Sequence, residues 1–222
     1  MITSKLMKGS EVPGRQHIWL RLSKRLGGLL VAALLVHGAA LASDGEPRGL
    51  IEGLHAALLE SMHDAERLGY TGRYEALAPV LRQTFDFPFM TRLSLGRAWN
   101  QFEAAEQERL VDLFAQMSIA NFAARFDGFS GERFEVRDES AGPRDTVVVE
   151  SAILRPADDP VELNYVLRAG EGGWQIIDVL LDGKYSELAR QRAEFAAVLA
   201  SGGLPELVAT LERKIEELAG QG

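Results

Sequence analysis

Apolar residues recur every three to four positions through residues 47–126, the spacing of helices that bury one face. Gly69 and Gly96 interrupt this pattern and are expected to end helices. Asp86, followed by Pro88, is expected to cap the start of a helix, and Pro79 is expected to bend or restart another. The pattern predicts four helices, over residues 47–68, residues 73–84, residue 86 to the stop at residue 96, and residues 104–126.

After residue 131 the period changes to two, which indicates strands with two distinct faces. Short turns between them favour an antiparallel meander. The predicted strands cover residues 133–137, 145–154, 161–168 and 173–181. In the third, Val161, Leu163, Tyr165 and Leu167 face one way. The fourth is apolar on both faces, so its pattern leaves open which residues point inward.

Two more helices are predicted after the sheet, over residues 186–200 and 205–218, with Gly202-Gly203 between them. Helices, then strands, then helices indicate the α+β class, with helices packed on a curved antiparallel sheet. We expect one domain over residues 43–222. Its helical part covers about residues 46–126 and 186–218, and its sheet about residues 133–181.

The first 42 residues have the pattern of a secretory signal peptide rather than of a folded element. Arg21, Lys24 and Arg25 precede an apolar run over residues 26–36, and small residues up to Ala42 form an A-x-A cleavage site. An uncleaved anchor is the alternative, although the run is short for a membrane span. The pattern predicts export to the periplasm.

Composition narrows the possible functions further. The chain has no Cys, which excludes disulfides, thiolate metal sites and cysteine nucleophiles. Its formal net charge is −8. Removal of residues 1–42, which hold six basic residues and one acidic residue, leaves −13. Nucleic acid is therefore not an expected partner, and contact with an anionic membrane surface is expected to be only transient.

The chain offers few residues suited to catalysis, and no metal or cofactor is expected. His55 and His63 are too far apart on one helix to chelate a metal together and are expected to lie on the surface. An enzymatic alternative uses Asp178, set among apolar residues, as a general acid or base, with Tyr165 as a hydrogen-bond donor to an oxyanion. The competing structural interpretation pairs Asp178 with a cation such as Arg192, or gives it buried hydrogen bonds.

Large apolar side chains are in excess, above all over residues 85–99 and 114–126. Each could belong to a packed core, but a curved sheet with helices on one face leaves an interior that either side chains or a ligand must fill. Met and Phe suit a deformable lining for a greasy molecule. The candidate lining residues are Met90, Leu93, Trp99, Phe114, Met117, Phe122, Tyr165, Ile177, Val179 and Leu181.

Several segments resemble the MlaC/toluene-tolerance family of periplasmic lipid carriers. They are residues 73–99, residues 174–183, Ser186 and residues 192–195. Residues 85–90, 123–128 and 179–183 are most similar to the HpnM branch, which is associated with hopanoids. Lys184-Tyr185 departs from the MlaC branch, where a small or aliphatic pair is more usual.

The resemblance implies an NTF2-like cone of curved sheet with a helical subdomain and a lipid cavity between them, and it implies no enzymatic activity. It also implies a hopanoid or related lipid as ligand, with a phospholipid as the alternative. The implied partner is an inner-membrane transporter of the RND or ABC type. It further suggests turn or cap conformations at Gly96 and Gly183 and a buried ion pair between Asp178 and Arg192. An interaction module with a solid interior remains a further alternative.

Overall fold

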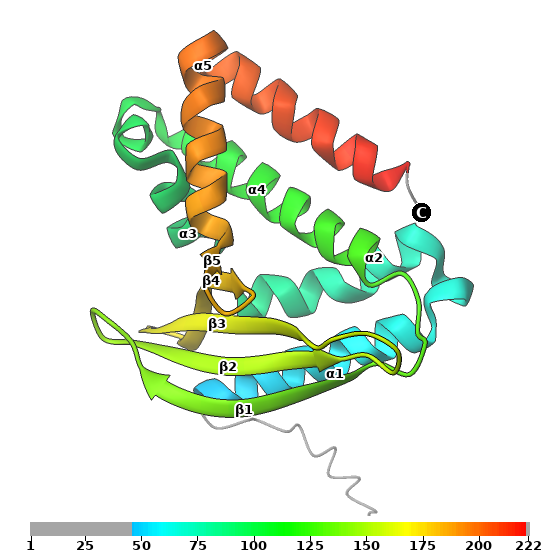
Figure 1. Cartoon of the computed structure of the whole chain (residues 1–222). Coiled ribbons are helices and arrows are strands. Elements are labelled where there is room, and N and C mark those ends of the chain that lie inside the picture. The colour runs from blue at the N-terminus through cyan, green and yellow to red at the C-terminus, as the bar shows by residue number, and fades with distance from the viewer. Residues whose placement is uncertain (1–45, 221–222) are drawn as a thin grey trace, which may run out of the picture. The chain divides into compact units, whose positions relative to one another are not determined.

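The computed structural model describes residues 46–220, and the predicted signal segment lies outside them. Helices, a sheet and a last helix follow one another along the chain (Figure 1). The helices are α1 (Pro47–His63), α2 (Ala65–Thr84), α3 (Phe87–Leu95), the 3-10 helix η1 (Gly96–Gln101), α4 (Ala104–Arg125) and α5 (Glu187–Ala219). The strands are β1 (Arg133–Ala141), β2 (Thr146–Leu154), β3 (Val161–Gly170), β4 (Gly173–Leu181) and β5 (Tyr185–Ser186). The predicted α+β class is confirmed.

The helix boundaries differ from the prediction at one place. The first predicted helix breaks at Asp64, between α1 and α2, where neither Gly nor Pro marks the sequence. Gly69, the predicted end, also breaks the helix: it has φ of 59° and ψ of −175° and forms a kink inside α2 where two helical stretches meet, so a break at this residue is confirmed. Pro79 lies inside α2 without ending it. The predicted stop at Gly96 is confirmed, since this residue caps the end of α3 with φ of 56°.

Asp86 connects the start of α3 to the sheet through hydrogen bonds. Its Oδ1 accepts a hydrogen bond from the backbone N–H of Phe89 at 3.0 Å, which confirms the predicted N-cap. Its Oδ2 accepts two further hydrogen bonds from the guanidinium of Arg168 on β3, at 2.6 and 3.0 Å. The Arg168 guanidinium also lies 4.0 Å from the centre of the Phe89 ring. One carboxylate therefore joins a helix end, a strand and an aromatic ring.

Asp86→Ala is expected to lower the free energy of unfolding by about 2 kcal/mol, since it removes both the cap and the partner of Arg168. Asp86→Asn keeps an oxygen for the cap and loses the charge, so its effect should be smaller. Urea denaturation of both variants, beside the exposed-site control Glu108→Ala, measures the difference. Equal stability of Asp86→Ala and the control would contradict this role.

The sheet is an antiparallel meander in the order β1-β2-β3-β4-β5, as predicted. Tyr165 at its centre pairs with Val149 on β2 and with Val179 on β4. On β4, Ile176 pairs with Leu167 and Asp178 pairs with Val166, so Ile177 between them is an extra residue in a β-bulge. Beyond the bulge, Val179 and Leu181 share the face of Tyr165. β1 continues to Ala141, past the predicted residue 137, through residues that are mostly exposed.

The helices cover the face of the sheet that carries Tyr165, and the core lies between them. α1 packs along this face, while α3 and α5 contact β4. A chain of aromatic rings then links the helices: Phe87 packs edge-on against Phe114 of α4, and Phe114 packs edge-on against Phe195 of α5. Phe114 is fully buried in this cluster. In this part of the interior, side chains fill the space between the helices.

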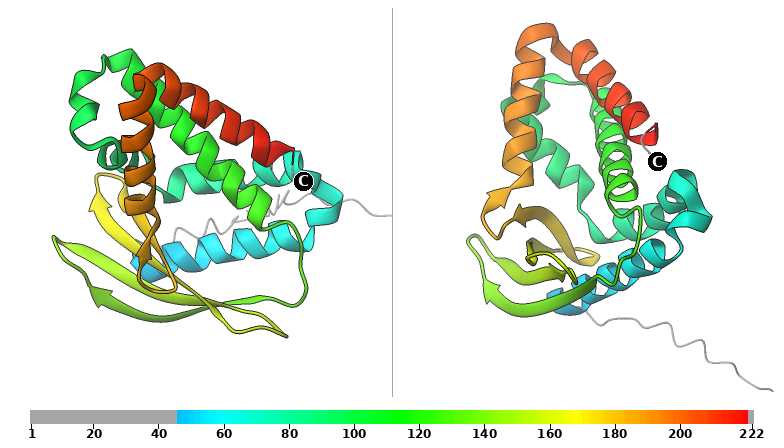
Figure 2. Two further views of the ribbon diagram at one scale, coloured as in Figure 1. Left: turned by 45° about the horizontal axis from the view of Figure 1, so that its top comes forward. Right: turned by 45° about the vertical axis from the view of Figure 1, so that its right-hand side comes forward.

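α5 is bent at Gly203, between the two helices that the sequence predicts there. Gly203 has φ of 66° and ψ of −158°, a conformation that residues with a side chain rarely adopt. Figure 2 shows the two halves meeting at this bend, with the second half beside α4. Among the described helices, α5 has the length and composition of a membrane span, with a mean hydropathy of 1.3 over 18 residues, of which 22% are buried.

Candidate functional site

A cavity of about 280 Å³ lies between the sheet and the helices. Its walls come from Phe85 directly after α2, from Met90 of α3, from the second half of α4, from β2, β3 and β4, and from the first turns of α5. Its lining residues are Phe85, Met90, Ser118, Asn121, Phe122, Arg125, Phe126, Ile153, Val161, Leu163, Tyr165, Val179, Leu181, Glu187, Arg190 and Gln191.

The sheet supplies an apolar wall. Val161, Leu163 and Tyr165 alternate along β3 and point the same way, as the period of two predicts. Val179 and Leu181 lie opposite Tyr165 and Leu163 in the register with β4. Because these side chains come from paired positions on adjacent strands, they form a continuous surface.

The helix α4 lines the cavity with a stripe of mixed polarity. Ser118, Asn121, Phe122 and Arg125 are spaced by three and four residues, so they share one face of the helix. Across from them, Glu187, Arg190 and Gln191 belong to the first turns of α5. The cavity therefore has an apolar side on the sheet and a polar side on the helices.

Half of the predicted lining residues lie in the cavity wall: Met90, Phe122, Tyr165, Val179 and Leu181. Phe114 and Met117 are buried in the helical core instead. Leu93 and Trp99 pack half-buried against that core, outside the cavity. Ile177 is the bulge residue of β4 and does not reach the cavity.

The polar residues of α4 and α5 at the cavity are not among the lining residues predicted from the sequence, which are all apolar or aromatic. The signal for those on α4 was the helical spacing of Ser118, Asn121 and Arg125 around Phe122. For α5 the sequence carries no comparable signal, because its first turns come to the cavity through the tertiary fold.

His55 is buried beneath the cavity, so the expectation that it lies on the surface is wrong. It is 4% exposed, and its Nε2 lies 3.1 Å from the hydroxyl of Tyr165, which is itself fully buried. Its ring stacks on Phe134 at 4.5 Å. Burial lowers the pKa of His55 to about 4 and raises the pKa of Tyr165, so both are neutral at neutral pH. His63 is exposed, as expected.

Asp178 holds the start of α5 and does not line the cavity. Its Oδ1 accepts hydrogen bonds from the backbone N–H of Val179 at 2.8 Å and of Leu188 at 3.0 Å. Its Oδ2 accepts the hydroxyl of Ser186 at 2.5 Å, and Ser186 caps α5 by accepting from Ala189. These contacts agree with the structural alternative for Asp178, in which its carboxylate accepts hydrogen bonds within the fold.

The predicted ion pair between Asp178 and Arg192 is absent. Arg192 is exposed on α5 and lies against Gly96. Asp178 pairs with Val166, next to the pair of Tyr165 and Val179, so Asp178 and Tyr165 occupy opposite faces of the sheet. The enzymatic alternative needs both side chains at one site, and the fold does not bring them together.

Asp178→Ala is expected to lower the free energy of unfolding by about 2 kcal/mol, because it leaves the donors at the start of α5 without their acceptor. Asp178→Asn keeps an acceptor oxygen and should cost less. We expect lipid bound by Asp178→Asn, measured by native mass spectrometry, to match the wild type. A tenfold loss of lipid in a variant that remains folded would contradict a purely structural role for Asp178.

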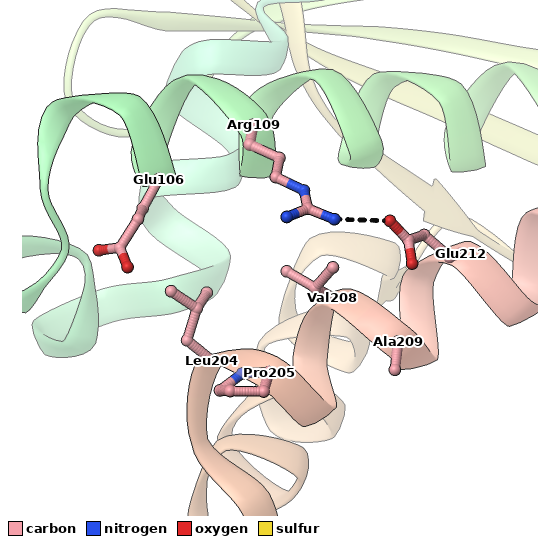
Figure 3. Close-up of a pocket in the computed structure, with 7 residues that line it drawn as sticks. All are labelled: Glu106, Arg109, Leu204, Pro205, Val208, Ala209 and Glu212. Carbon is pink, nitrogen blue, oxygen red and sulfur yellow. Dashed lines mark hydrogen bonds and ion pairs between the residues drawn. The ribbon is translucent and has the colours of Figure 1, made fainter.

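A second hollow, of about 370 Å³, lies between the start of α4 and the second half of α5 (Figure 3). Leu204, Pro205 and Val208 form its apolar floor. Arg109 of α4 and Glu212 of α5 form an ion pair across it at 2.8 Å. Because none of its walls comes from the sheet, it lacks the continuous apolar surface of the first cavity.

Metal chemistry has no candidate site in the described part of the chain. Within residues 46–220, no group of three or more His, Asp or Glu side chains is arranged to hold a metal ion.

Comparison with known proteins agrees with this geometry. The family model described as "MlaC protein" matches residues 53–213. A solved structure of a phospholipid-binding protein from Ralstonia solanacearum, in complex with a phospholipid, is similar with a TM-score of 0.68 and 22% sequence identity. The match covers 77% of this chain and 97% of that one, and it shows the shared fold. A comparison with curated proteins gives no match. Since the family model spans well over half of the chain, this protein belongs to the MlaC family.

Proposed function

We propose that this protein is a periplasmic lipid carrier that shelters the apolar part of one lipid in the cavity between the sheet and the helices. The observation that carries the proposal is the cavity of about 280 Å³, walled by paired apolar side chains of β3 and β4 in a member of the MlaC family. A lipid that hides about 400 Å² of apolar surface gains roughly 10 kcal/mol at about 25 cal/mol/Å². This gain offsets the cost of leaving a membrane.

The cavity volume is close to the lower limit of the roughly 300–1,000 Å³ that is usual for small-molecule pockets. A cavity of this size accommodates part of a lipid, so a whole one requires the lining from α4 and α5 to move apart. The polar residues of these two helices then stay beside the lipid's head.

Two ligand classes have support from different observations. A phospholipid is favoured because a solved structure of the same fold contains one. A hopanoid or related lipid is supported by the similarity of residues 85–90, 123–128 and 179–183 to the HpnM branch. We place the phospholipid first, since the solved structure shows a ligand in this fold, whereas the hopanoid rests on sequence similarity alone.

Transfer by such a carrier is passive. The protein exchanges lipid when it docks on a membrane complex, and the partner sets the direction, because a carrier alone only equilibrates. An inner-membrane transporter of the RND or ABC type is the proposed partner, on the basis of the family resemblance. No catalytic step is part of this function.

Native mass spectrometry of the protein purified from the periplasm tests the proposal. The expected result is one lipid per chain, without residues 1–42. A two-chain phosphorylated lipid would eliminate the hopanoid, and a triterpenoid mass would eliminate the phospholipid. A chain that is empty after purification and takes up neither lipid from vesicles would overturn the carrier function.

A further inference from the structure

Tyr185 on β5 is the most exposed large apolar side chain in the described part of the chain. It is 59% exposed, and Phe129, the other exposed one, is 41% exposed. Phe129 packs against the ring of His63, with 3.8 Å between the ring centres. Tyr185 has the ammonium of Lys184 over its ring, 4.9 Å from the centre. A single exposed ring is common on protein surfaces, so its position decides whether it has a function.

The pairing of β5 with β4 places this ring at the edge of the cavity. Tyr185 lies directly opposite Leu181, which lines the cavity. Residues opposite one another in an antiparallel pair share a face of the sheet, with Cβ atoms about 5 Å apart. The next residue, Ser186, points to the other face, where its hydroxyl donates a hydrogen bond to Asp178. Tyr185 therefore extends the apolar wall of the sheet past the end of the lining.

The backbone on both sides of Tyr185 is held in place. Before it, Asp182 and Gly183 have φ of 51° and 67°, as in a type I′ turn. The N–H of Asp182 donates to the carbonyl oxygen of Glu162 on β3 at 3.0 Å, which joins this turn to the sheet. After it, Ser186 caps the start of α5. Because the segment is already ordered, a ligand that packs on the ring has little chain entropy to overcome.

The cavity reaches the surface close to this segment. Arg190 lines the cavity, yet its side chain is 56% exposed. Glu187, which also lines the cavity, follows Tyr185 by two residues, and Figure 1 shows β5 leading directly into α5. The cavity of about 280 Å³ accommodates only part of a lipid. A chain that leaves the cavity at the first turns of α5 therefore passes beside Tyr185.

We infer that Tyr185 is a rim contact: its ring packs on the apolar chain of an amphiphile that is longer than the cavity and strengthens the binding of that ligand. This inference rests on the proposed carrier function and adds a dependence on ligand length. A chain that ends within the cavity does not reach the ring, whereas a chain that continues past Leu181 covers it. If the contact removes about 40 Å² of apolar surface from water, binding of the longer ligand tightens about fivefold.

Two amphiphiles that share a headgroup and differ in chain length test the rim contact. The probes are 1-octanoylglycerol and 1-hexadecanoylglycerol, and native mass spectrometry measures their dissociation constants. Tyr185→Ala is expected to weaken binding of the longer probe about fivefold and to leave the shorter one unchanged. Tyr185→Phe should bind both as the wild type does, because the ring and not the hydroxyl makes the contact.

Two further variants serve as checks. Tyr185→Thr, which keeps a residue suited to a strand, should give the same result as Tyr185→Ala. Phe129→Ala removes the other exposed aromatic ring, which lies outside the cavity lining, and should change neither dissociation constant. Thermal unfolding of each variant confirms that it is folded.

The outcomes distinguish the rim contact from the carrier function. If Tyr185→Ala and Tyr185→Thr bind the longer probe as tightly as the wild type, the rim contact is overturned and the carrier function stands. An equal loss of both probes would also overturn it, since the contact would then not depend on chain length. If the wild type binds neither probe, both proposals fail, because a cavity that shelters an apolar chain should bind the longer one.

Discussion

Val179→Trp is expected to reduce lipid binding at least tenfold while the protein remains folded. Val179 lines the cavity and lies opposite Tyr165 in the sheet. Its side chain is only partly buried, so a larger group extends into the cavity instead of into the packed core. The indole then occupies the space that the lipid's apolar part needs.

The matched control is Leu180→Trp, one position along the same strand. Leu180 is also partly buried but is not part of the cavity lining. Lipid retained after purification, counted by native mass spectrometry, and the thermal unfolding midpoint are measured for both variants. Full occupancy in Val179→Trp would show that the lipid lies elsewhere. Equal loss in both variants would point to a disturbed sheet and not to a filled cavity.

Acid is expected to destabilise the wild-type protein through His55. Its pKa falls from 6.5 to about 4 on folding, so the unfolded chain binds a proton between these pH values and the folded chain does not. Protonation of His55 in the unfolded chain therefore has no effect on stability above about pH 7. As the pH falls to 4, it lowers the free energy of unfolding by about 3 kcal/mol. The histidine that causes this loss is buried in contact with Tyr165, which lines the cavity.

His55→Gln isolates this effect from the titration of carboxylates, because the variant has no imidazole to protonate. The difference in unfolding free energy between variant and wild type should move by about 3 kcal/mol in the variant's favour between pH 7 and pH 4. His63→Gln, which changes an exposed histidine on the same helix, is the matched control. Parallel curves for wild type and His55→Gln would contradict a buried neutral His55.

The sequence was most informative where one face of an element is covered and the other is not. The alternation of Leu163, Tyr165 and Leu167 in β3 predicted correctly that these side chains share one face, and all three are buried. The pattern of β4 did not predict which of its residues point inward, because both faces are apolar and the bulge at Ile177 shifts the alternation. A bulge depends on the pairing between strands, which a single strand's sequence does not encode.

The helix α4 shows a second limit. Apolar residues occur around most of its circumference, since it contacts α2, α3 and α5 as well as the cavity. Phe114 and Phe122 are therefore equivalent in sequence, although one fills the core and the other lines the cavity. Which of them meets empty space depends on the packing of other helices.

The burial of His55, in contrast, could have been predicted. It follows Ile51 by four residues and Leu54 by one, so it lies on the buried stripe of α1. A surface position was predicted because His55 has no partner nearby with which to bind a metal. That prediction did not take the helical periodicity into account. The hydroxyl of Tyr165, which satisfies the imidazole, comes from a strand 110 residues away.

The bend at Gly203 has a consequence for how the protein can meet a bilayer. A straight helix of 33 residues would be about 50 Å long, more than the roughly 30 Å of a hydrocarbon layer. Folded back on itself, α5 becomes two arms of about 24 Å each, and neither is long enough to traverse the layer. The described helix with the length and composition of a membrane span is thus bent into two short arms, the second of which packs beside α4.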